Sequence, residues 1–349
     1  MSRVFVAMSG GVDSSVAAAL LLETGHDVTG VTMQLWPSSD ADGGCCSVNA
    51  VRDARRVCDL LGIPHYALNF RDAFERDVVT PFADAYARGE TPNPCIVCND
   101  RLKFADLLAK VMAQEADYLA TGHYARIVRD EDGVPWLARG IDARKDQSYF
   151  LYRLTVAQME RVLFPLGSLT KTEVRAIATR LGLPVAEKPE SQEVCFAAAG
   201  EHSAVVGTRH PEALVPGPIV DRRGELLGRH AGLAHYTVGQ RRGLGLSSQE
   251  PLYVLSIDAN QNRLVVGGLD DLEVGQVEAR DAVWHSSPAM EAESVVRYRM
   301  TPVASRASYE SGRLSVTFRQ PVRGVAPGQA VVCYAGERVL GGGVIECAD

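Results

Sequence analysis

Short apolar runs alternate with segments of helical periodicity through the first half of the chain. Apolar runs of strand length occur at residues 4–8, 28–33, 65–70 and 118–121. Apolar positions recur at helical spacing over 16–24, 51–61 and 101–115, and a capping box at 170–173 precedes a helix that ends near Gly182. This alternation predicts an α/β domain with a doubly wound parallel sheet.

Beyond about residue 200 the pattern changes to short β-type runs separated by Gly and Pro. Such runs lie at 252–257, 263–266, 315–318 and 330–334. They predict two small β-rich domains, the second of them barrel-like, behind the α/β domain. We therefore expect domains at residues 1–205, 206–274 and 275–349.

The composition is that of an ordinary globular protein, with 46% hydrophobic and 23% charged residues. The first residues lack the long apolar core of a signal peptide, and no apolar run approaches the roughly 18 residues of a membrane span. Eight cysteines in 349 residues are too sparse for a disulfide scaffold. We expect a cytoplasmic protein with no membrane partner.

A net charge of −7 argues against a general nucleic-acid binder and against DNA as a partner. Residues 219–245 are an exception, because five arginines face only two acidic residues there. This segment is a candidate RNA surface, and an ordinary solvated loop is the alternative. The arginines are Arg222, Arg223, Arg229, Arg241 and Arg242.

A glycine-rich turn, Ser9-Gly10-Gly11-Val12-Asp13-Ser14-Ser15, follows the first predicted strand directly and opens a helix. Glycines let the backbone approach a ligand, while hydroxyl groups and the unpaired N–H groups of a first helical turn point at it. The turn lacks the Lys of a Walker A loop and the spacing of a dinucleotide fingerprint. It is a candidate anion site, and two glycines alone would indicate only a tight turn.

Two cysteine segments are candidates for chemistry. Cys95 and Cys98 follow two prolines, and Cys98 is expected just ahead of the helix at 101–115, where the helix dipole favours a thiolate. Cys195 is the second candidate. Buried structural roles are expected for Cys58, Cys333 and Cys347, while redox or metal roles stay open for Cys45 and Cys46 in a Gly-rich loop.

Several separated motifs occur together in one order. They are residues 9–15, Pro92 to Asn99, Gly122 to Arg126, Arg144 to Phe150, Glu193 to Phe196 and Thr237 to Leu244. With them the chain resembles the tRNA-specific 2-thiouridylase family over essentially its whole length, and the glycine turn resembles the pyrophosphate loop of the N-type ATP pyrophosphatases. The resemblance implies an adenine nucleotide alpha hydrolase-like fold, ATP as cosubstrate and an adenylated intermediate.

The resemblance also assigns the nucleotide site. It implies that Asp13 helps to position Mg²⁺ and that the remaining residues contact ATP: Ala7, Met8, Ser9, Gly10, Gly11, Val12, Ser14, Ser15, Met33 and Gly122. For Met33, core packing is the alternative interpretation. Met33 and Gly122 both lie at carboxyl ends of predicted parallel strands, where open α/β sheets bind ligands.

For the cysteines, the resemblance implies that Cys195 bears a persulfide and that Cys98 is its catalytic partner, with a disulfide between them after turnover. Two thiols suit this chemistry because a second thiolate can break the S–S bond of a persulfide. Cys95 stands where the better-known family pattern has an Asp assigned to acid/base assistance. A minority hypothesis is that Cys95, Cys98 and Cys195 ligate a 4Fe–4S cluster.

The resemblance further implies contacts with an anticodon stem-loop. The matching residues are Asn93, Pro94, Cys95, His123, Lys145, Asp146, Gln147, Arg297, Tyr298 and Gln329. Packing is the alternative for His123, and a surface ion pair is the alternative for Arg297. The target base must leave its stack for chemistry at C2, which suits an unpaired loop.

The favoured function is ATP-dependent conversion of the wobble uridine of tRNA to 2-thiouridine, with sulfur from a persulfide carrier protein. Two alternatives remain. One is a pyrophosphatase-loop synthetase that amidates a small acid, which has no need of Cys98 and Cys195 together. The other is a redox-responsive RNA-binding protein without turnover, which would release no AMP or pyrophosphate.

Overall fold

The computed structural model describes residues 1–35, 48–189, 194–197 and 202–349. Cys45, Cys46 and Glu193, the first residue of one motif, lie outside the described residues. Close contacts within the chain define two compact units. The first comprises residues 1–78, 95–198 and 337–339, and the second comprises 79–94, 199–336 and 340–349.

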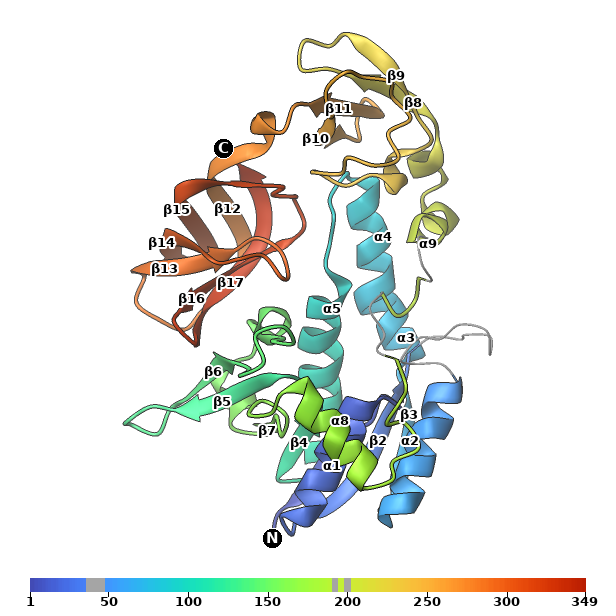
Figure 1. Cartoon of the computed structure of the whole chain (residues 1–349), viewed down its shortest axis with the longest axis vertical. Coiled ribbons are helices and arrows are strands. Elements are labelled where there is room, and N and C mark those ends of the chain that lie inside the picture. Colours follow the sequence, from blue (N-terminus) through green and yellow to red (C-terminus); the bar gives the residue numbers. More distant parts are fainter. Residues whose placement is uncertain (36–47, 190–193, 198–201) are drawn as a thin grey trace. The chain divides into compact units, whose positions relative to one another are not determined.

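A five-stranded parallel sheet forms the centre of the first unit (Figure 1). Its strand order is β3-β2-β1-β4-β7, and Val4 of β1 lies opposite Val28 of β2 and Tyr118 of β4. The strands are β1 (Arg3–Ala7), β2 (Asp27–Gln34), β3 (His65–Asn69), β4 (Tyr118–Thr121) and β7 (Val162–Leu163). The predicted doubly wound parallel sheet is confirmed.

Three helices share one apolar core with this sheet: α1 (Val12–Glu23), α2 (Val48–Leu61) and α8 (Lys171–Arg180). Val6 of β1, Val16 of α1 and Val174 of α8 are fully buried in it. The predicted capping box is confirmed, since the Thr170 hydroxyl accepts from the Glu173 N–H and the Glu173 side chain accepts from the Thr170 N–H. The shorter helical segments of this unit are α3 (Arg71–Phe74), η3 (Ser148–Leu151) and α7 (Val156–Met159).

Helix α1 begins four residues before the predicted start at residue 16, because Gly11 serves as its N-cap and Asp13 lies in its first turn. The predicted helix at 101–115 likewise begins earlier. Helix α5 (Pro94–Val97) continues as the π-helix η2 (Cys98–Leu107) and then as α6 (Leu108–Met112). Proline is favoured in a first helical turn, which explains the start at Pro94.

An antiparallel hairpin of β5 (Ala125–Arg129) and β6 (Pro135–Arg139) follows β4 in the same unit. The sequence pattern did not predict it. Gly133 has φ +80° in the connection between the two strands, a conformation that glycine adopts readily. Residues 140–153 follow β6 directly.

The second unit contains a four-stranded sheet of order β10-β11-β8-β9 and several short helical segments. The strands are β8 (Gly217–Val220), β9 (Leu226–His230), β10 (Tyr253–Asp258) and β11 (Arg263–Gly267). The helical segments are η1 (Glu75–Val79), which crosses from the first unit, α4 (Thr80–Ala87), α9 (His202–Arg209), η4 (Pro211–Leu214), η5 (Leu233–His235) and η6 (Asp270–Leu272). Ile219, Val254 and Leu264 are buried in the core of this sheet.

The same unit contains a β-barrel in which β12 pairs with both β15 and β17. The strands are β12 (Glu273–Trp284), β13 (Ala289–Val295), β14 (Val303–Glu310), β15 (Arg313–Arg323), β16 (Ala330–Ala335) and β17 (Arg338–Ala348). Val277, Leu314 and Val331 are fully buried inside it. No helix within the described ranges is long and apolar enough to cross a membrane.

Candidate active site

The glycine turn lies where the winding of the sheet reverses, between β1 and β4. From β1 the chain builds outward through β2 and β3, and then returns to place β4 on the other side of β1. Open parallel sheets bind ligands at such a switch point, outside the carboxyl ends of the strands. Gly122, which follows β4, touches the turn, since a Cβ there would lie 2.7 Å from the Ser14 nitrogen.

Hydrogen bonds fold residues 9–15 into a tight cradle. The Ser9 N–H donates to Ser14 Oγ at 3.1 Å, and the Ser15 hydroxyl donates to the Gly11 carbonyl at 2.8 Å. Gly10 has φ +67°, and a Cβ on it would lie 2.2 Å from the Ala50 carbonyl oxygen. Gly11 brings no side chain to cap α1, so the N–H groups of the first turn remain available to an anion.

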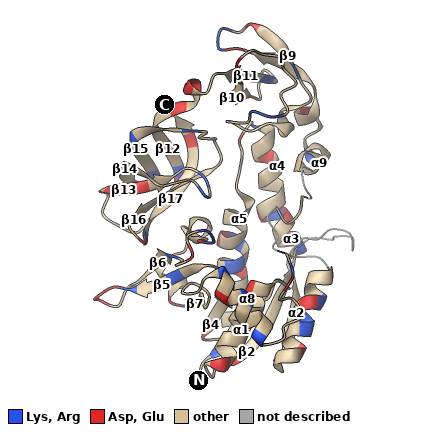
Figure 2. Cartoon of the chain, viewed as in Figure 1, with Lys and Arg blue, Asp and Glu red and all other residues tan. Residues whose placement is uncertain are grey.

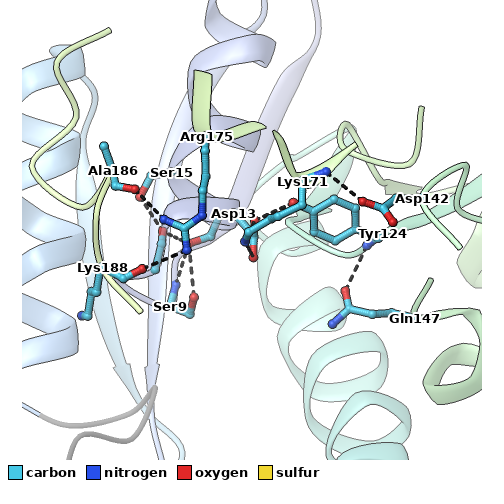
Figure 3. Close-up of polar contacts among 12 residues, drawn as sticks. Ser9, Asp13, Ser15, Tyr124, Asp142, Gln147, Lys171, Arg175, Ala186 and Lys188 are labelled. Carbon is cyan, nitrogen blue, oxygen red and sulfur yellow. Dashed lines mark hydrogen bonds and ion pairs between the residues drawn. The ribbon is translucent and has the colours of Figure 1, made fainter. Parts of the chain in front are cut away.

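Asp13 is the acidic residue of this turn, and two side chains from other elements bond to it (Figure 3). Lys171 Nζ lies 2.7 Å and 2.9 Å from the two Asp13 carboxylate oxygens, and the Tyr124 hydroxyl donates to Asp13 Oδ1 at 2.8 Å. Lys171 is only 9% exposed. A cation is unfavourable in the first turn of a helix, so this lysine in α8 needs the carboxylate that it faces.

Lys188 holds the other side of the cradle. Its Nζ donates to the Gly10 carbonyl at 2.9 Å and to Asp53 Oδ2 at 2.6 Å. Arg175 of α8 donates to the Ala186 carbonyl at 2.8 Å and to the Lys188 carbonyl at 3.4 Å (Figure 3). Helix α8 thus supplies Lys171 to Asp13, and its Arg175 holds the segment that contains Lys188.

Sequence reasoning missed Lys171 and Lys188 as parts of this site. Residues 170–173 carried a signal, because a lysine at the first position of a helix opposes the helix dipole and calls for a partner. Of the other predicted nucleotide residues, Met33 lies in β2 and is 9% exposed, and the Met8 N–H donates to the Val31 carbonyl. The role of Met33 therefore stays a prediction.

A Mg²⁺ ion in such a site is commonly held by one or two carboxylates together with substrate phosphates. Asp13 supplies one carboxylate at the N-terminal turn of α1, which fits this donor set. Cys95, Cys98 and Cys195 do not make a metal site in the described residues, since no group of three or more His, Cys, Asp or Glu side chains is arranged there to hold an ion.

Cys98 lies in a continuous helix, which corrects the expectation that it precedes one. It is the first residue of the π-helix η2 and is half-buried, while Cys95 in the first turn of α5 is exposed. Long π-helical stretches are rare and often occur at functional sites. Asn99 ties this helix to η3, because its Nδ2 donates to the Phe150 carbonyl at 3.2 Å.

Cys195 is half-buried, and the next residue, Phe196, anchors it. The Phe196 ring packs edge-on against Phe74 of α3, with ring centroids 5.6 Å apart. Helix α3 also packs against η2, the helix that begins with Cys98. The structure thus brings the segments of Cys98 and Cys195 to one short helix, α3.

The remaining cysteines divide by burial. Burial raises the pKa of Cys58 and of Cys333 to about 12, so both thiols are inert core residues as predicted. The prediction of burial was wrong for Cys347, which is exposed near the C-terminus. The register of β17 against β12 shifts between Ile345 and Cys347, so Cys347 does not share the buried face of Ile345.

Two predicted RNA residues of the first unit, Asp146 and Gln147, bond within the protein through their side chains. The Asp146 carboxylate accepts from the N–H groups of Gly140 and Ser148, both at 3.0 Å. Gln147 Oε1 accepts from the Tyr124 N–H at 3.0 Å, which connects residues 145–147 to the tyrosine that bonds Asp13. These two side chains therefore shape the loop, and their expected contacts with RNA stay predictions.

His123 lies beside the aromatic rings of Phe104 and Phe164 and shares a hydrogen bond of 2.7 Å with the Thr121 hydroxyl. Burial, together with the positive charge of Lys103, holds the pKa of His123 well below its ordinary value. The imidazole is therefore neutral at physiological pH. It can pair with RNA only as a neutral donor or acceptor.

The predicted RNA residues of the second unit lie on its barrel and sheet. Arg297 is exposed, and Tyr298 next to it is half-buried under the Arg299 guanidinium at 5.2 Å. In the connection from β8 to β9, coloured by charge in Figure 2, Arg222 forms an ion pair with Asp271. The other arginines of 219–245 are exposed: Arg223, Arg229, Arg241 and Arg242.

Comparison with known proteins identifies the family. A tRNA methyl transferase HUP domain matches residues 2–199, a tRNA methyl transferase PRC-barrel domain matches 204–268, and an aminomethyltransferase β-barrel domain matches 274–345. A tRNA-specific 2-thiouridylase of Moorella thermoacetica is 51% identical, with 98% of both chains covered. That of Geobacter metallireducens is 49% identical over 99% of this chain and 97% of its own.

The chain belongs to the tRNA-specific 2-thiouridylase family. The resemblance deduced from the motifs is thereby confirmed, as is the fold class of a parallel-sheet domain followed by two β-rich domains. A solved 4-thiouridine synthetase in complex with RNA and ATP is 17% identical, with a TM-score of 0.37 over 60% of this chain and 51% of that chain. A likeness of this size adds nothing to the family assignment.

Proposed function

We propose that the protein is an ATP-dependent tRNA uridine 2-sulfurtransferase that converts the wobble uridine of tRNA to 2-thiouridine. Relatives that are about half identical over nearly the full length bear the name tRNA-specific 2-thiouridylase. The observation that carries the proposal is a nucleotide cradle in the same unit as two half-buried cysteines on segments that share α3. ATP activation and thiol chemistry must act on one base, which requires such a unit.

The first step activates the base. The uridine C2 oxygen attacks the α-phosphorus of ATP, and pyrophosphate leaves. The cradle at residues 9–15 offers its N–H groups to the departing pyrophosphate, and Lys171 and Lys188 add positive charge beside it. Mg²⁺ bound near Asp13 would further offset the phosphate charge.

The second step transfers sulfur. The terminal sulfur of a persulfide on Cys195 attacks C2, and AMP leaves with the original oxygen. The Cys98 thiolate then attacks Cys195 Sγ, which breaks the S–S bond, releases 2-thiouridine and leaves a disulfide between the two cysteines. A thiol reductant must supply two electrons to reset the enzyme, and a persulfide carrier protein must reload Cys195.

RNA contacts belong to the same proposal. Asn93, Pro94 and Cys95 would meet the flipped target base, and the segments of His123 and Lys145 to Gln147 would contact the anticodon stem-loop. On the second unit, exposed Arg297 and half-buried Tyr298 suit phosphate and base contacts, and the exposed arginines of 219–245 suit phosphate. A cytoplasmic location follows from this activity, because unmodified tRNA and ATP are available there.

Incubation of the protein with ATP, a persulfide donor, a thiol reductant and unmodified tRNA, followed by nucleoside analysis, tests the proposal. We expect 2-thiouridine together with equal amounts of AMP and pyrophosphate. AMP and pyrophosphate without 2-thiouridine would favour the amidating synthetase, and no ATP turnover with tRNA present would favour an RNA-binding protein. Iron analysis of protein purified without oxygen separates the persulfide route, which needs no iron, from the cluster hypothesis.

A further inference from the structure

The segment Gly89 to Thr91 follows α4 and leads directly into the loop of Asn93 and the helix of Cys95 and Cys98. The segment belongs to the second unit and contacts the domain there that contains the β10-β11-β8-β9 sheet. Gly89 has φ +80°, and a Cβ on it would lie 2.9 Å from the Ile257 carbonyl oxygen of β10. The Thr91 hydroxyl donates to the Thr237 hydroxyl at 3.4 Å. The sheet domain therefore touches both ends of the segment.

The barrel grips the same segment with its own backbone and side chains. The Thr91 N–H donates to the Pro327 carbonyl at 2.7 Å, and Gln329 Nε2 donates to the Thr91 carbonyl at 2.9 Å. Arg280 of β12 lies 3.1 Å from the Glu90 carboxylate. We call this set of contacts to Gly89 to Thr91 the strap clamp.

The strap clamp determines the path of the chain at this point. Thr91 is only 8% exposed, and the barrel satisfies both its N–H and its carbonyl group. Glu90 is 18% exposed in its side chain, so its carboxylate depends on the arginines that surround it. Pro92 and Pro94 follow, and each fixes its own φ, so little freedom separates the strap clamp from the start of α5.

We propose that Arg280 and Gln329 are positioning residues, which hold Gly89 to Thr91 so that the adjoining target-base loop and Cys98 meet the uridine correctly. This inference rests on the proposed function and deepens it. It gives Gln329 a different role from the RNA contact expected from the sequence, because its amide N–H group is already bonded to Thr91. The same barrel that presents Arg297 and Tyr298 thus fixes the chain that enters the catalytic helix.

The physical reason lies in the demands of group transfer. Reacting atoms must approach closely and in line, and a displacement of about 1 Å can cost about 100-fold in rate. Cys98 follows Thr91 by less than two helical turns of chain, and no other element lies between them in the sequence. A displacement of Gly89 to Thr91 would therefore displace Cys98 as well. Binding of tRNA depends on the RNA-facing side chains and is not expected to need the strap clamp.

The test uses Arg280→Met and Gln329→Met in the full chain, each of which removes hydrogen-bond donors at similar side-chain length. Arg319→Met is the matched control, because Arg319 pairs with Glu291 on the same barrel at 2.8 Å and is exposed. Arg280→Lys keeps the positive charge and serves as the conservative rescue. Thermal unfolding and ATP binding confirm that each variant is folded.

Three quantities are measured: the dissociation constant for tRNA, the single-turnover rate of 2-thiouridine formation at saturating tRNA, and the alkylation rate of Cys98 relative to exposed Cys347. We expect about a 10-fold lower single-turnover rate in both Met variants, with tRNA affinity unchanged. We also expect faster relative alkylation of Cys98 in these variants. Arg280→Lys should recover much of the loss, and Arg319→Met should behave as the wild type.

The outcomes that overturn the inference are distinct from failure of the proposed function. A weaker tRNA affinity with an unchanged rate at saturation would make Gln329 an RNA contact, and an unchanged rate and alkylation would leave the strap clamp without a role. If the wild type makes no 2-thiouridine, the proposed function fails. The relative alkylation of Cys98 then decides alone whether the strap clamp positions this helix.

Discussion

The cradle of residues 9–15 and the pair of Cys98 and Cys195 are built in different ways within one unit. The cradle is a single stretch of seven residues after β1, folded by its own hydrogen bonds and backed by Lys171 and Lys188. The cysteines come from two segments far apart in the sequence, and α3 is their shared neighbour. Rigid backbone N–H groups suit a charge that develops on phosphate, whereas thiols that must exchange sulfur need partly exposed positions.

The largest expected effect separates the two regions by removing the thiols. We predict that Cys98→Ala and Cys195→Ala each lower 2-thiouridine formation by at least about 1000-fold, since a nucleophile has no substitute. ATP binding should persist, because the cradle does not use these side chains. Nucleoside analysis and ATP titration measure the two effects, with Cys347→Ala as the exposed-cysteine control. Undiminished product from either variant would remove the role assigned to that cysteine.

The second prediction removes charge from the cradle. Asp13→Ala and Lys171→Met are each expected to slow tRNA-dependent AMP formation by about 100-fold. The first removes the carboxylate that would hold Mg²⁺, and the second removes positive charge beside the phosphates, so each weakens stabilisation of the transition state. Loading of Cys195 with persulfide, read by mass spectrometry, should remain. Lys110→Met is the control, since Lys110 is an exposed lysine of α6. Loss of persulfide loading in the Asp13 or Lys171 variants would show that the two regions are not separable.

The third prediction concerns the rigidity of the cradle. Gly10→Ala should lower the free energy of unfolding by about 3 kcal/mol, because its left-handed φ and the contact with the Ala50 carbonyl both oppose a Cβ. Gly133→Ala has a similar φ with open space around it, so only about 1 kcal/mol is expected. Urea denaturation measures both. Equal losses would mean that close packing behind the cradle is unimportant.

The smallest expected effect lies in the second unit, which contains neither region. Asp84 at 2.7 Å and Glu212 at 2.9 Å raise the pKa of His210 above its ordinary value of 6.5. The protonated form is favoured in the folded state, so this stabilisation is complete below pH 6.5 and is lost as pH rises through the raised pKa. His210→Gln should cost less than about 1 kcal/mol at low pH and nothing at high pH, because the group is partly exposed.

Unfolding curves across this pH range check the His210 prediction. His235→Gln is the matched control, because His235 is exposed in the same unit. A loss of stability in His210→Gln that grows as pH rises would contradict the assigned direction of the pKa shift. AMP formation should be insensitive to His210→Gln at every pH.

Sequence reasoning succeeded where local backbone chemistry decides the structure. The glycine turn and the strand at 118–121 follow from period and turn chemistry, which a single segment contains. The partners of Asp13 could not be predicted, since Lys171 and Tyr124 reach it only through the fold. The π-helical register of η2 likewise could not be predicted, because ten residues make too few turns for apolar spacing to separate i→i+5 from i→i+4 hydrogen bonding.

The cysteine pair was predicted in part. Its residues were predicted from motifs, and the structure adds the anchor of Phe196 on Phe74. The early start at Pro94 was missed because the helix was predicted only from residue 101, although proline is favoured in a first helical turn. The grip on Gly89 to Thr91 depends on contacts from two β-rich domains and leaves no local pattern in the sequence.

The central claim is that the cradle and the thiols act in turn on one carbonyl, so that the displaced oxygen leaves as part of AMP. An anticodon stem-loop with oxygen-18 at C2 of the target uridine tests this directly, with mass spectrometry of the AMP after one turnover. The account predicts one oxygen-18 in AMP for each 2-thiouridine formed. Unlabelled AMP, with the label found in water or in pyrophosphate while 2-thiouridine accumulates, would contradict it.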